Sequence, residues 1–197
     1  MKRIPRYILF SGVNGAGKTT LYNILIKSHD LGERINIDEI VAREGNWKDA
    51  LLQLKATRQA MSMITDCLKR RVSFHQETTL TGPTIIKQIK KAKDAGYRIQ
   101  LYYVGVENLQ TAVRRVESRV SKGGHGVDRT LIEQRFEKLP EALHNIMPLV
   151  DNAFFYDNTV KFKQVAYLKN NILVDYDFDL PVWFWEIIAR NDVQLKQ

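Results

Sequence analysis

The sequence is poor in cysteine and has no long apolar run, and each shortage excludes a class of protein. Cys67 is the only cysteine among 197 residues, so an internal disulfide and a thiolate metal cluster are both excluded. No apolar stretch approaches the roughly 20 residues that a membrane-spanning helix requires. The apolar run Tyr7–Phe10 follows basic residues but is too short for the core of a signal peptide. We therefore expect a soluble, cytoplasmic protein that does not enter a membrane.

Size and charge predict one domain that attracts anions. The chain is 44% hydrophobic, which supplies enough apolar surface for a single core, so we expect one domain over residues 1–197. The formal net charge is +8 and the pI is near 9.5. A positive charge attracts nucleotides, sugar phosphates, nucleic acids and acidic membranes alike, so it does not distinguish among them. A phosphate-handling enzyme is a sufficient explanation.

Short strand-like runs alternate along the chain with longer helical ones. This pattern is typical of strand-helix-strand units around a parallel sheet. The segment Trp47–Leu68 carries apolar residues at helical spacing and predicts the longest helix. The predicted strands are Tyr7–Ser11, Ile35–Ile37, Arg71–His75, Tyr97–Val106 and Ala153–Tyr156.

Two further helices and the loop between them predict a lid. Asn108 can cap a helix that Gly123-Gly124 ends, and Thr130 with Glu133 matches a capping box that starts the next helix. The loop between the two helices is rich in glycine, so we expect it to be mobile. The lid should cover about residues 107–139.

The pattern changes after residue 160. Two strand-like runs flank Lys169-Asn170-Asn171, which predicts a hairpin. Trp183–Ile188 has helical spacing and predicts a short closing helix, whose aromatic residues we expect to pack against the core. We expect about residues 160–197 to form a small appendage to the domain.

One motif binds phosphate in many proteins, and it occurs between the first predicted strand and helix. It runs from Gly12 to Thr19 and matches G-x-x-x-x-G-K-[ST] at every specified position. Glycines let the chain wrap around an anion, backbone N–H groups point inward, and the following helix presents its positive end. The alternative, a ligand-free glycine turn, does not require this strand-loop-helix context. The predicted nucleotide-binding residues are Gly12, Val13, Asn14, Gly15, Ala16, Gly17, Lys18, Thr19 and Thr20.

The motif predicts the fold and the donor. We expect an α/β, P-loop nucleoside-triphosphate fold with a five-stranded, mostly parallel sheet flanked by helices, a helical lid, and a C-terminal hairpin plus helix. Lys18 can reach the outer phosphates, and the Thr19 hydroxyl can bind Mg²⁺. ATP and GTP remain equal candidates, because the loop binds phosphates through backbone groups that both nucleotides satisfy.

Several segments together resemble the zeta-toxin-like P-loop kinase family, up to about Asn158. This resemblance implies a Mg²⁺-dependent phosphotransferase with an alcohol acceptor, and the family's characterised members phosphorylate a hydroxyl of UDP-N-acetylglucosamine. The matching segments are Gly12–Thr20, Asn36–Ile40, Glu77–Gly82, Arg119–Val120 with Gly123–His125, Ile132–Phe136 and Tyr156–Asn158.

Asp38 is the candidate general base. It lies just past the second predicted strand, where the carboxyl ends of parallel strands open onto a ligand crevice. By the resemblance it matches the residue that accepts the proton of the attacking hydroxyl, which is a catalytic role as well as a substrate contact. The alternative is that Asp38 merely caps the turn into Glu39-Ile40.

Glu77 and Thr79 are the other candidates on the acceptor side. Glu77 is expected to follow the third strand, where a carboxylate could hold Mg²⁺ through water, together with Thr19, or contact the acceptor. A surface carboxylate at a strand end is the plain alternative. Thr79 could donate a hydrogen bond to the acceptor or cap the next helix.

The lid arginines are candidates for neutralising charge on the transferring phosphoryl group. A guanidinium suits that task because its planar fork pairs with two oxygens. We single out Arg119 and Arg135, with Arg115 and Arg129 as further possibilities, and exposed solvent-facing arginines as the alternative. The sequence departs from the family pattern near Val127-Asp128-Arg129, where a proline usually follows the valine. His125 has no partner placed by sequence, so we treat it as a lid residue.

Two other classes of function stay open. A P-loop NTPase switch would need an apolar strand ending in aspartate, and the third strand offers Gln76-Glu77 instead. A polynucleotide or nucleoside kinase would explain the charge of +8, but the basic residues are scattered. The helix Trp47–Leu68 offers a surface for an antitoxin-like protein partner, although no sequence feature identifies one.

Overall fold

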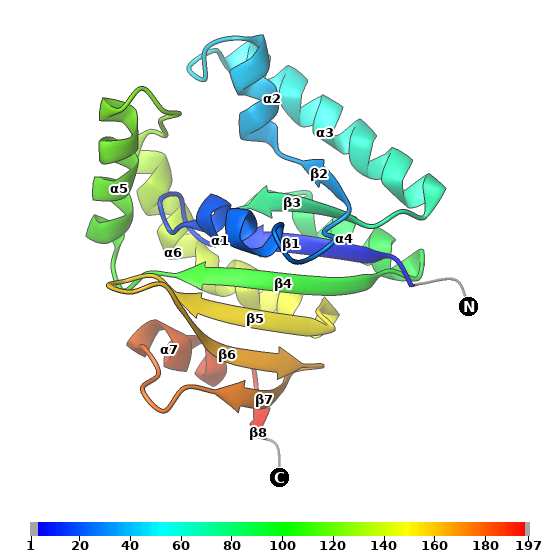
Figure 1. The fold of residues 1–197 in the computed structure, drawn as a ribbon, viewed down its shortest axis with the longest axis vertical. Coiled ribbons are helices and arrows are strands. Elements are labelled where there is room, and N and C mark those ends of the chain that lie inside the picture. Colours follow the sequence, from blue (N-terminus) through cyan, green and yellow to red (C-terminus); the bar gives the residue numbers. More distant parts are fainter. Residues whose placement is uncertain (1–3, 196–197) are drawn as a thin grey trace.

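An eight-stranded sheet forms the centre of the computed structural model, which describes residues 4–195 (Figure 1). The strand order is β2-β3-β1-β4-β5-β6-β7-β8. Neighbouring strands from β2 to β5 are parallel. Strand β6 is antiparallel to both β5 and β7, and β8 is parallel to β7. The strands are β1 (Arg6–Ser11), β2 (Glu33–Ile35), β3 (Phe74–Thr78), β4 (Arg98–Gly105), β5 (Asn152–Asp157), β6 (Lys163–Lys169), β7 (Ile172–Tyr176) and β8 (Gln194–Leu195).

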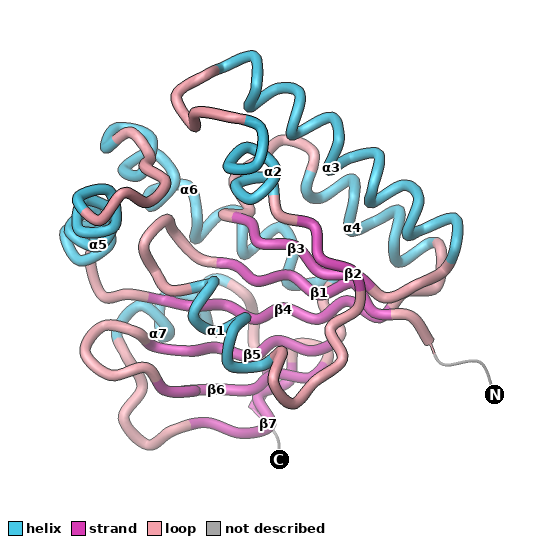
Figure 2. The backbone as a smooth tube through the Cα atoms, turned by 45° about the horizontal axis from the view of Figure 1, so that its top comes forward, coloured by secondary structure: helices cyan, strands magenta, loops and turns pink. Residues whose placement is uncertain are grey.

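Helices cover both faces of this sheet. Figures 1 and 2 show α1 on one face and α4, α6 and α7 on the other, while α3 runs beside the edge strand β2. None of the helices within residues 4–195 combines the length and the apolar character needed to cross a bilayer. The helices are α1 (Lys18–Leu25), α2 (Ile37–Glu44), α3 (Ala50–Arg70), α4 (Ile85–Asp94), α5 (Leu109–Ser121), α6 (Arg129–Ile146), the 3-10 turn η1 (Met147–Leu149) and α7 (Val182–Arg190).

The core is built on the two central strands. Tyr7–Phe10 of β1 is fully buried, and Leu101–Val104 of β4 is nearly so. Such continuous apolar runs are expected of parallel strands that are covered on both faces. The α/β prediction with a mostly parallel sheet is confirmed, but the sheet has eight strands instead of the predicted five, because β6, β7 and β8 extend it. The ends of the predicted domain, residues 1–3 and 196–197, lie outside the described residues.

Two predicted strands lie elsewhere by two or three residues. The third strand is Phe74–Thr78 rather than Arg71–His75, because Arg71 takes a left-handed conformation (φ 54°) and ends α3. Glu77 therefore lies within β3 instead of following it. The second strand ends at Ile35, since Asn36 caps α2.

The predicted capping box of the second lid helix is wrong in register. Asp128, not Thr130, is the N-cap of α6, and its side chain accepts a hydrogen bond from the Thr130 backbone N–H at 2.9 Å. Asp128 is as good a cap as threonine and comes earlier in the chain. The cap at the other lid helix is confirmed, because Asn108 Oδ1 accepts from the Thr111 backbone N–H at 2.9 Å.

The C-terminal hairpin forms as predicted, but it extends the main sheet. Strand β6 pairs with β5, and β8, which was not predicted, pairs with β7. Stacked rings join the hairpin to the central strands: the centroid distances are 5.4 Å for Phe10–Tyr102, 4.8 Å for Tyr102–Phe154 and 4.7 Å for Phe154–Tyr167. The hairpin therefore covers what would otherwise be an open sheet edge at β5.

Phe184 should be the main anchor of α7. Its ring is fully buried and packs 5.1 Å from Phe155 between centroids, whereas the neighbouring Trp185 is 54% exposed. Phe184→Ala should lower the free energy of unfolding by about 3–5 kcal/mol, because a large buried ring leaves a cavity. The matched control Trp185→Ala should change it by less than about 1 kcal/mol. Equal effects of the two variants in urea denaturation would contradict this account of α7.

Candidate active site

The carboxyl ends of the parallel strands meet at one edge of the sheet. The loop from Gly12 to Gly17 leaves β1 there, and the loops after β2, β3 and β5 leave at the same edge. This edge is where doubly wound folds bind ligands. The residues that the sequence singled out from four separate segments are therefore brought to one place.

The loop between β1 and α1 has the geometry of an anion cradle. Gly12 and Gly15 have positive φ angles of 139° and 83°, and a Cβ on either would collide with a carbonyl oxygen, of Val104 and Ala112 respectively. Only glycine, which has no side chain, can lie so close to the neighbouring backbone. Within residues 4–195, the backbone N–H groups of Gly15 and Gly17 donate to no other group of the chain. They are available to an anion, together with the N-terminus of α1.

Lys18 places its ammonium group over this loop. Its Nζ donates to the backbone oxygens of Gly12 at 2.9 Å and Val13 at 3.0 Å. Burial lowers the Lys18 pKa to about 8; the negative charges of Glu77 and Asp38 oppose the shift, and the nearby lid arginines add to it. Thr19 follows in the first turn of α1, and Thr20 is exposed in the same turn.

The loop is held from two sides by distant parts of the chain. Arg135 of α6 donates from Nη1 to Asn14 Oδ1 at 2.8 Å. Asn158, which follows β5, donates from Nδ2 to the backbone oxygen of Ala16 at 2.7 Å. Both contacts bridge more than 120 residues of sequence, so they could not be read from local patterns.

Glu77 joins the loop to a cluster of polar residues on β2 and α2. Its Oε2 accepts from Thr19 Oγ1 at 2.9 Å, and its Oε1 accepts from Arg34 Nη2 at 2.8 Å and Asn36 Nδ2 at 3.2 Å. The Arg34 side chain is only 18% exposed and that of Glu77 only 10%. Arg34 also pairs with Glu39 at 2.6 Å and lies over the ring of Tyr22. Arg34 is not among the residues predicted from the sequence, because nothing in the residues around it indicates these partners.

The Thr19 and Glu77 pair fits a magnesium ion. Both groups present oxygen, which is the ligand that Mg²⁺ prefers, and they already lie within hydrogen-bond distance of each other. Within residues 4–195, no group of three or more histidine, cysteine, aspartate or glutamate side chains could hold a metal. A protein site of one or two oxygens suits Mg²⁺ in particular, which keeps water and phosphate oxygens as its other ligands.

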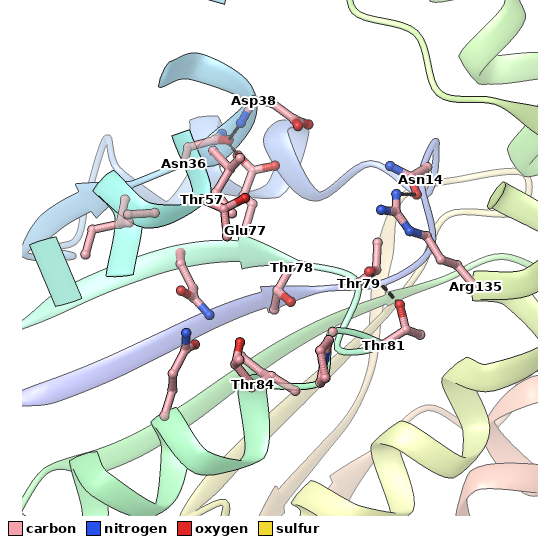
Figure 3. Close-up of a pocket in the computed structure, with 18 of the residues that line it drawn as sticks. Asn14, Asn36, Asp38, Thr57, Glu77, Thr78, Thr79, Thr81, Thr84 and Arg135 are labelled. Atoms are coloured by element: carbon pink, nitrogen blue, oxygen red, sulfur yellow. Dashed lines mark hydrogen bonds between the residues drawn. The ribbon is translucent and has the colours of Figure 1, made fainter. Parts of the chain in front are cut away.

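Asp38 lies in the first turn of α2 and does not cap it. Asn36 is the cap, and its Oδ1 accepts from the Asp38 backbone N–H at 3.0 Å. The Asp38 carboxylate therefore takes no part in capping the helix, and its side chain is 54% exposed. In Figure 3 it extends toward the side of the pocket that holds Asn14 and Arg135.

The loop between α5 and α6 reaches Asp38 through His125, for which the sequence indicated no partner. His125 Nε2 lies 3.6 Å from Asp38 Oδ1, and its ring lies against Trp47 with a centroid distance of 5.4 Å. Burial lowers the pKa of His125; the Asp38 charge opposes this shift and Arg119 adds to it. The loop between α5 and α6 is thus in contact with the start of α2.

The four candidate arginines have different surroundings in the structure. Arg135 contacts the phosphate loop at Asn14, and the charges of Arg135 and Arg119 both lower the pKa of Lys18. Arg129 is outside this group and forms an exposed ion pair with Glu133 at 3.0 Å. Arg115 donates from Nη2 to the backbone oxygen of Thr159 at 3.2 Å.

A cleft of about 570 Å³ runs from the phosphate loop to the space between α3 and α4. Asp38, Glu77 and Thr79, predicted as substrate contacts, all line it together with Lys18. Figure 3 shows Thr79 and Thr81 side by side, and their hydroxyl oxygens are 3.0 Å apart. Further polar residues that line the cleft are Asn14, Asn36, Gln53, Thr57, Gln76, Thr78, Thr81, Thr84, Gln88, Gln134, Arg135 and Lys138.

The two threonines are held by a strained residue between them. Leu80 has a φ of 62°, and its side chain is buried. A leucine in this left-handed region costs of order 1 kcal/mol or more, and such strain tends to gather at functional sites. Burial of Leu80 keeps the hydroxyls of Thr79 and Thr81 on the cleft side.

Comparison with known proteins gives this arrangement a family context. A sequence model of the zeta toxin family matches residues 2–180. An uncharacterised protein of Haemophilus influenzae is 29% identical over 129 residues, which are 66% of this chain and 91% of that protein.

Two solved structures share the fold. One is from the PezAT chromosomal toxin-antitoxin system of Streptococcus pneumoniae, with a TM-score of 0.63 and 18% identity; the match covers 97% of this chain and 86% of that one. The other is the AvrRxo1-ORF1:-ORF2 structure with ATP, with a TM-score of 0.66 and 15% identity, which covers 85% of this chain and 59% of that one. At these identities the likeness concerns the fold alone.

Lys18 should make nucleotide binding depend on pH. Because its pKa is about 8, the group is charged at pH 7 and mostly neutral at pH 9, and a neutral amine cannot pair with phosphate. The affinity for ATP, measured by titration calorimetry, should fall by about 10-fold between these two pH values. Lys18→Arg, which keeps its proton, should show no such fall. A wild-type affinity that is constant from pH 7 to 9 would contradict the lowered pKa.

Arg34 should be needed mainly to balance its two carboxylate partners. Arg34→Met should lower the free energy of unfolding by about 3 kcal/mol, because Glu77 is left without its cation in a poorly solvated place. The double variant Arg34→Met/Glu77→Gln should recover about 1 kcal/mol or more. The exposed ion pair of Arg70 and Glu33 gives the control, since Arg70→Met should cost less than about 1 kcal/mol. Strictly additive effects of the Arg34 and Glu77 changes would exclude this coupling.

Proposed function

The chain belongs to the zeta toxin family of P-loop kinases, and we propose that it transfers the γ-phosphate of a nucleoside triphosphate to a hydroxyl group of a sugar nucleotide such as UDP-N-acetylglucosamine. The observation that carries the proposal is that a single cleft is lined by Lys18 of the phosphate loop and by the acceptor-side residues Asp38, Glu77 and Thr79. A donor phosphate and an acceptor hydroxyl bound there would lie next to each other, which is the main requirement for phosphoryl transfer.

The donor would be held through its phosphates. The free N–H groups of the loop and the N-terminus of α1 would bind them, and Lys18 would exchange its contacts with the Gly12 and Val13 carbonyl oxygens for contacts with the outer phosphates. Backbone groups do not distinguish ATP from GTP. ATP is the first donor to test, because the AvrRxo1 structure that shares this fold was solved with ATP.

Thr19 and Glu77 would hold the magnesium ion, Thr19 through its hydroxyl and Glu77 directly or through water. When bound, the ion would neutralise negative charge on the β- and γ-phosphates. Arg34 would keep Glu77 in place through its contact with Oε1, so that Oε2 stays directed at Thr19.

Asp38 would act on the acceptor. Its exposed carboxylate would accept the proton of the attacking hydroxyl while that oxygen forms a bond to the γ-phosphorus. The bond between the γ-phosphorus and the bridging oxygen would break, leaving a nucleoside diphosphate. Thr79 would donate a hydrogen bond to the acceptor, since its hydroxyl lies in the cleft beside that of Thr81.

Arg119 and Arg135 would stabilise the charge on the transferring group. Both lie near Lys18, and Arg135 already contacts the phosphate loop at Asn14. A guanidinium released from Asn14 could pair with two phosphate oxygens. Arg129 is not assigned this role, because it pairs with Glu133 on the exposed side of α6.

An antitoxin-like protein partner is a further part of the proposal. The PezAT structure, which shares this fold, is from a toxin-antitoxin system. Helix α3 carries exposed leucines at Leu51 and Leu54, which a partner could cover. We also propose a cytoplasmic location, which would supply the nucleotide and suit the free, buried thiol of Cys67.

Phosphate transfer to a panel of acceptors tests the proposed reaction. The purified protein is incubated with Mg²⁺, γ-labelled ATP, and sugar nucleotides, nucleosides or oligonucleotides in separate tubes. Label should move to the sugar nucleotides, with UDP-N-acetylglucosamine among them. Release of phosphate without any acceptor would instead favour an NTPase switch, and label confined to oligonucleotide ends would favour a polynucleotide kinase.

Variants of Asp38 and Lys18 test the assignment of roles. Asp38→Asn should lower transfer by about 10²–10⁴-fold with little change in affinity for ATP, because it removes proton acceptance only. Lys18→Ala should lower both transfer and affinity. Asp66→Asn, an exposed change on α3 outside the cleft, should alter neither. Full transfer by Asp38→Asn would refute the role of Asp38.

A further inference from the structure

Two glutamine amides lie at the end of the cleft between α3 and α4. Gln76 is on β3 and Gln88 is on α4, and both line the same cleft as Lys18 and Asp38. Their apolar neighbours in the cleft wall include Ile35, the strand partner of Gln76 on β2. The other apolar residues of this wall are Ala60, Met61, Ile64 and Ile85.

Both side chains are more than nine-tenths buried, since Gln76 is 8% exposed and Gln88 is 9% exposed. Within residues 4–195, no group hydrogen-bonds the side-chain amide of Gln76. The only partner of Gln88 is the thioether sulfur of Met61, 2.6 Å from Nε2, and sulfur is a weak acceptor. The unpaired amide atoms of the two glutamines keep some contact with solvent in the cleft, because none of them is among the fully buried polar atoms that lack a partner. They are therefore available to a molecule that enters the cleft.

Apolar side chains surround the two glutamines. Gln76 is the strand partner of Ile35 on β2, and Gln88 shares the buried face of α4 with Ile85 and Ile89. Neither amide caps a helix or bridges two strands.

We propose that Gln76 and Gln88 form a recognition site for a planar amide or imide group of the acceptor. The carboxamide of a glutamine carries N–H donors and a carbonyl acceptor. It can therefore pair with a group that has C=O and N–H side by side. The apolar wall suits the face of a flat ring or a methyl group. The inference rests on the proposed function, because it takes the cleft to be the acceptor site.

Two parts of a sugar nucleotide carry this chemistry. One is the imide edge of a uracil base, and the other is the acetamido group of an amino sugar. The cleft is continuous from Lys18 to Gln88, so an acceptor could place its reactive hydroxyl near Asp38 and its amide or imide at the two glutamines. The glutamine pair would then select acceptors by a group remote from the reacting one.

Binding of small probes, measured by titration calorimetry without any donor nucleotide, tests the inference. UMP is compared with its N3-methyl derivative, which lacks the imide N–H, and N-acetylglucosamine 1-phosphate is compared with glucose 1-phosphate, which lacks the acetamide. In one of the two pairs the wild type should bind the first compound at least about 10-fold more tightly. The pair that shows the preference identifies the group that is recognised.

Gln76→Leu and Gln88→Leu should each reduce that preference to about 3-fold or less, with the weaker compound of the pair bound as before. Gln110→Leu, at an exposed glutamine of α5 outside the cleft, should keep it in full. If a leucine variant fails to fold, as judged by thermal unfolding, the methionine variant at the same position takes its place. No preference in the wild type, or a preference that both glutamine variants retain, would overturn the inference.

The proposed reaction can fail independently of this binding. Phosphate transfer to UDP-N-acetylglucosamine with unchanged selectivity in the glutamine variants would leave the kinase intact and remove only the recognition site. Preferential binding of one probe over its matched compound, without any phosphate transfer, would support the recognition site and refute the reaction.

Discussion

The whole site depends on how closely the loop from Gly12 to Gly17 approaches the rest of the fold. A side chain at Gly12 or Gly15 would strike the backbone oxygen of a neighbouring element, so the loop can take its path only with glycine there. That path leaves backbone N–H groups unpaired and brings the N-terminus of α1 to the same point. Lys18, Asn158 and Arg135 then hold the loop from three directions.

Around this loop, charged side chains of opposite sign lie next to one another. The ammonium group of Lys18 is in the field of Glu77 and Asp38, and Glu77 in turn is held by Arg34. Burial of Arg34 and Glu77 makes each of them dependent on the other, because a charge removed from water needs a close partner. A site arranged in this way would hold phosphate and metal charge with little rearrangement of its own, as the proposed phosphoryl transfer requires.

The lid and the C-terminal strands support the site from outside. His125, in the loop between α5 and α6, contacts both Asp38 and Trp47, so this loop is joined to the start of α2 and to the segment that precedes α3. On the opposite side, Trp183 of α7 donates to Asp157 Oδ1 at 2.9 Å, at the end of the strand from which Asn158 reaches the loop. The predicted appendage is thus part of the sheet and contacts the segment that positions the loop.

The sequence by itself determined the phosphate loop, the α/β class and the gathering of Asp38, Glu77 and Thr79 at one edge of the sheet, because these depend on local spacing and on the direction of parallel strands. Only the tertiary structure decided that Asn36, not Asp38, caps α2, that Arg34 holds Glu77, and that Arg129 turns away. It also decided that the hairpin joins the sheet and that two glutamines line the same cleft. Most of these contacts join residues that are far apart in the chain. Which partner each residue contacts depends on burial and packing, and a local sequence pattern does not reveal either.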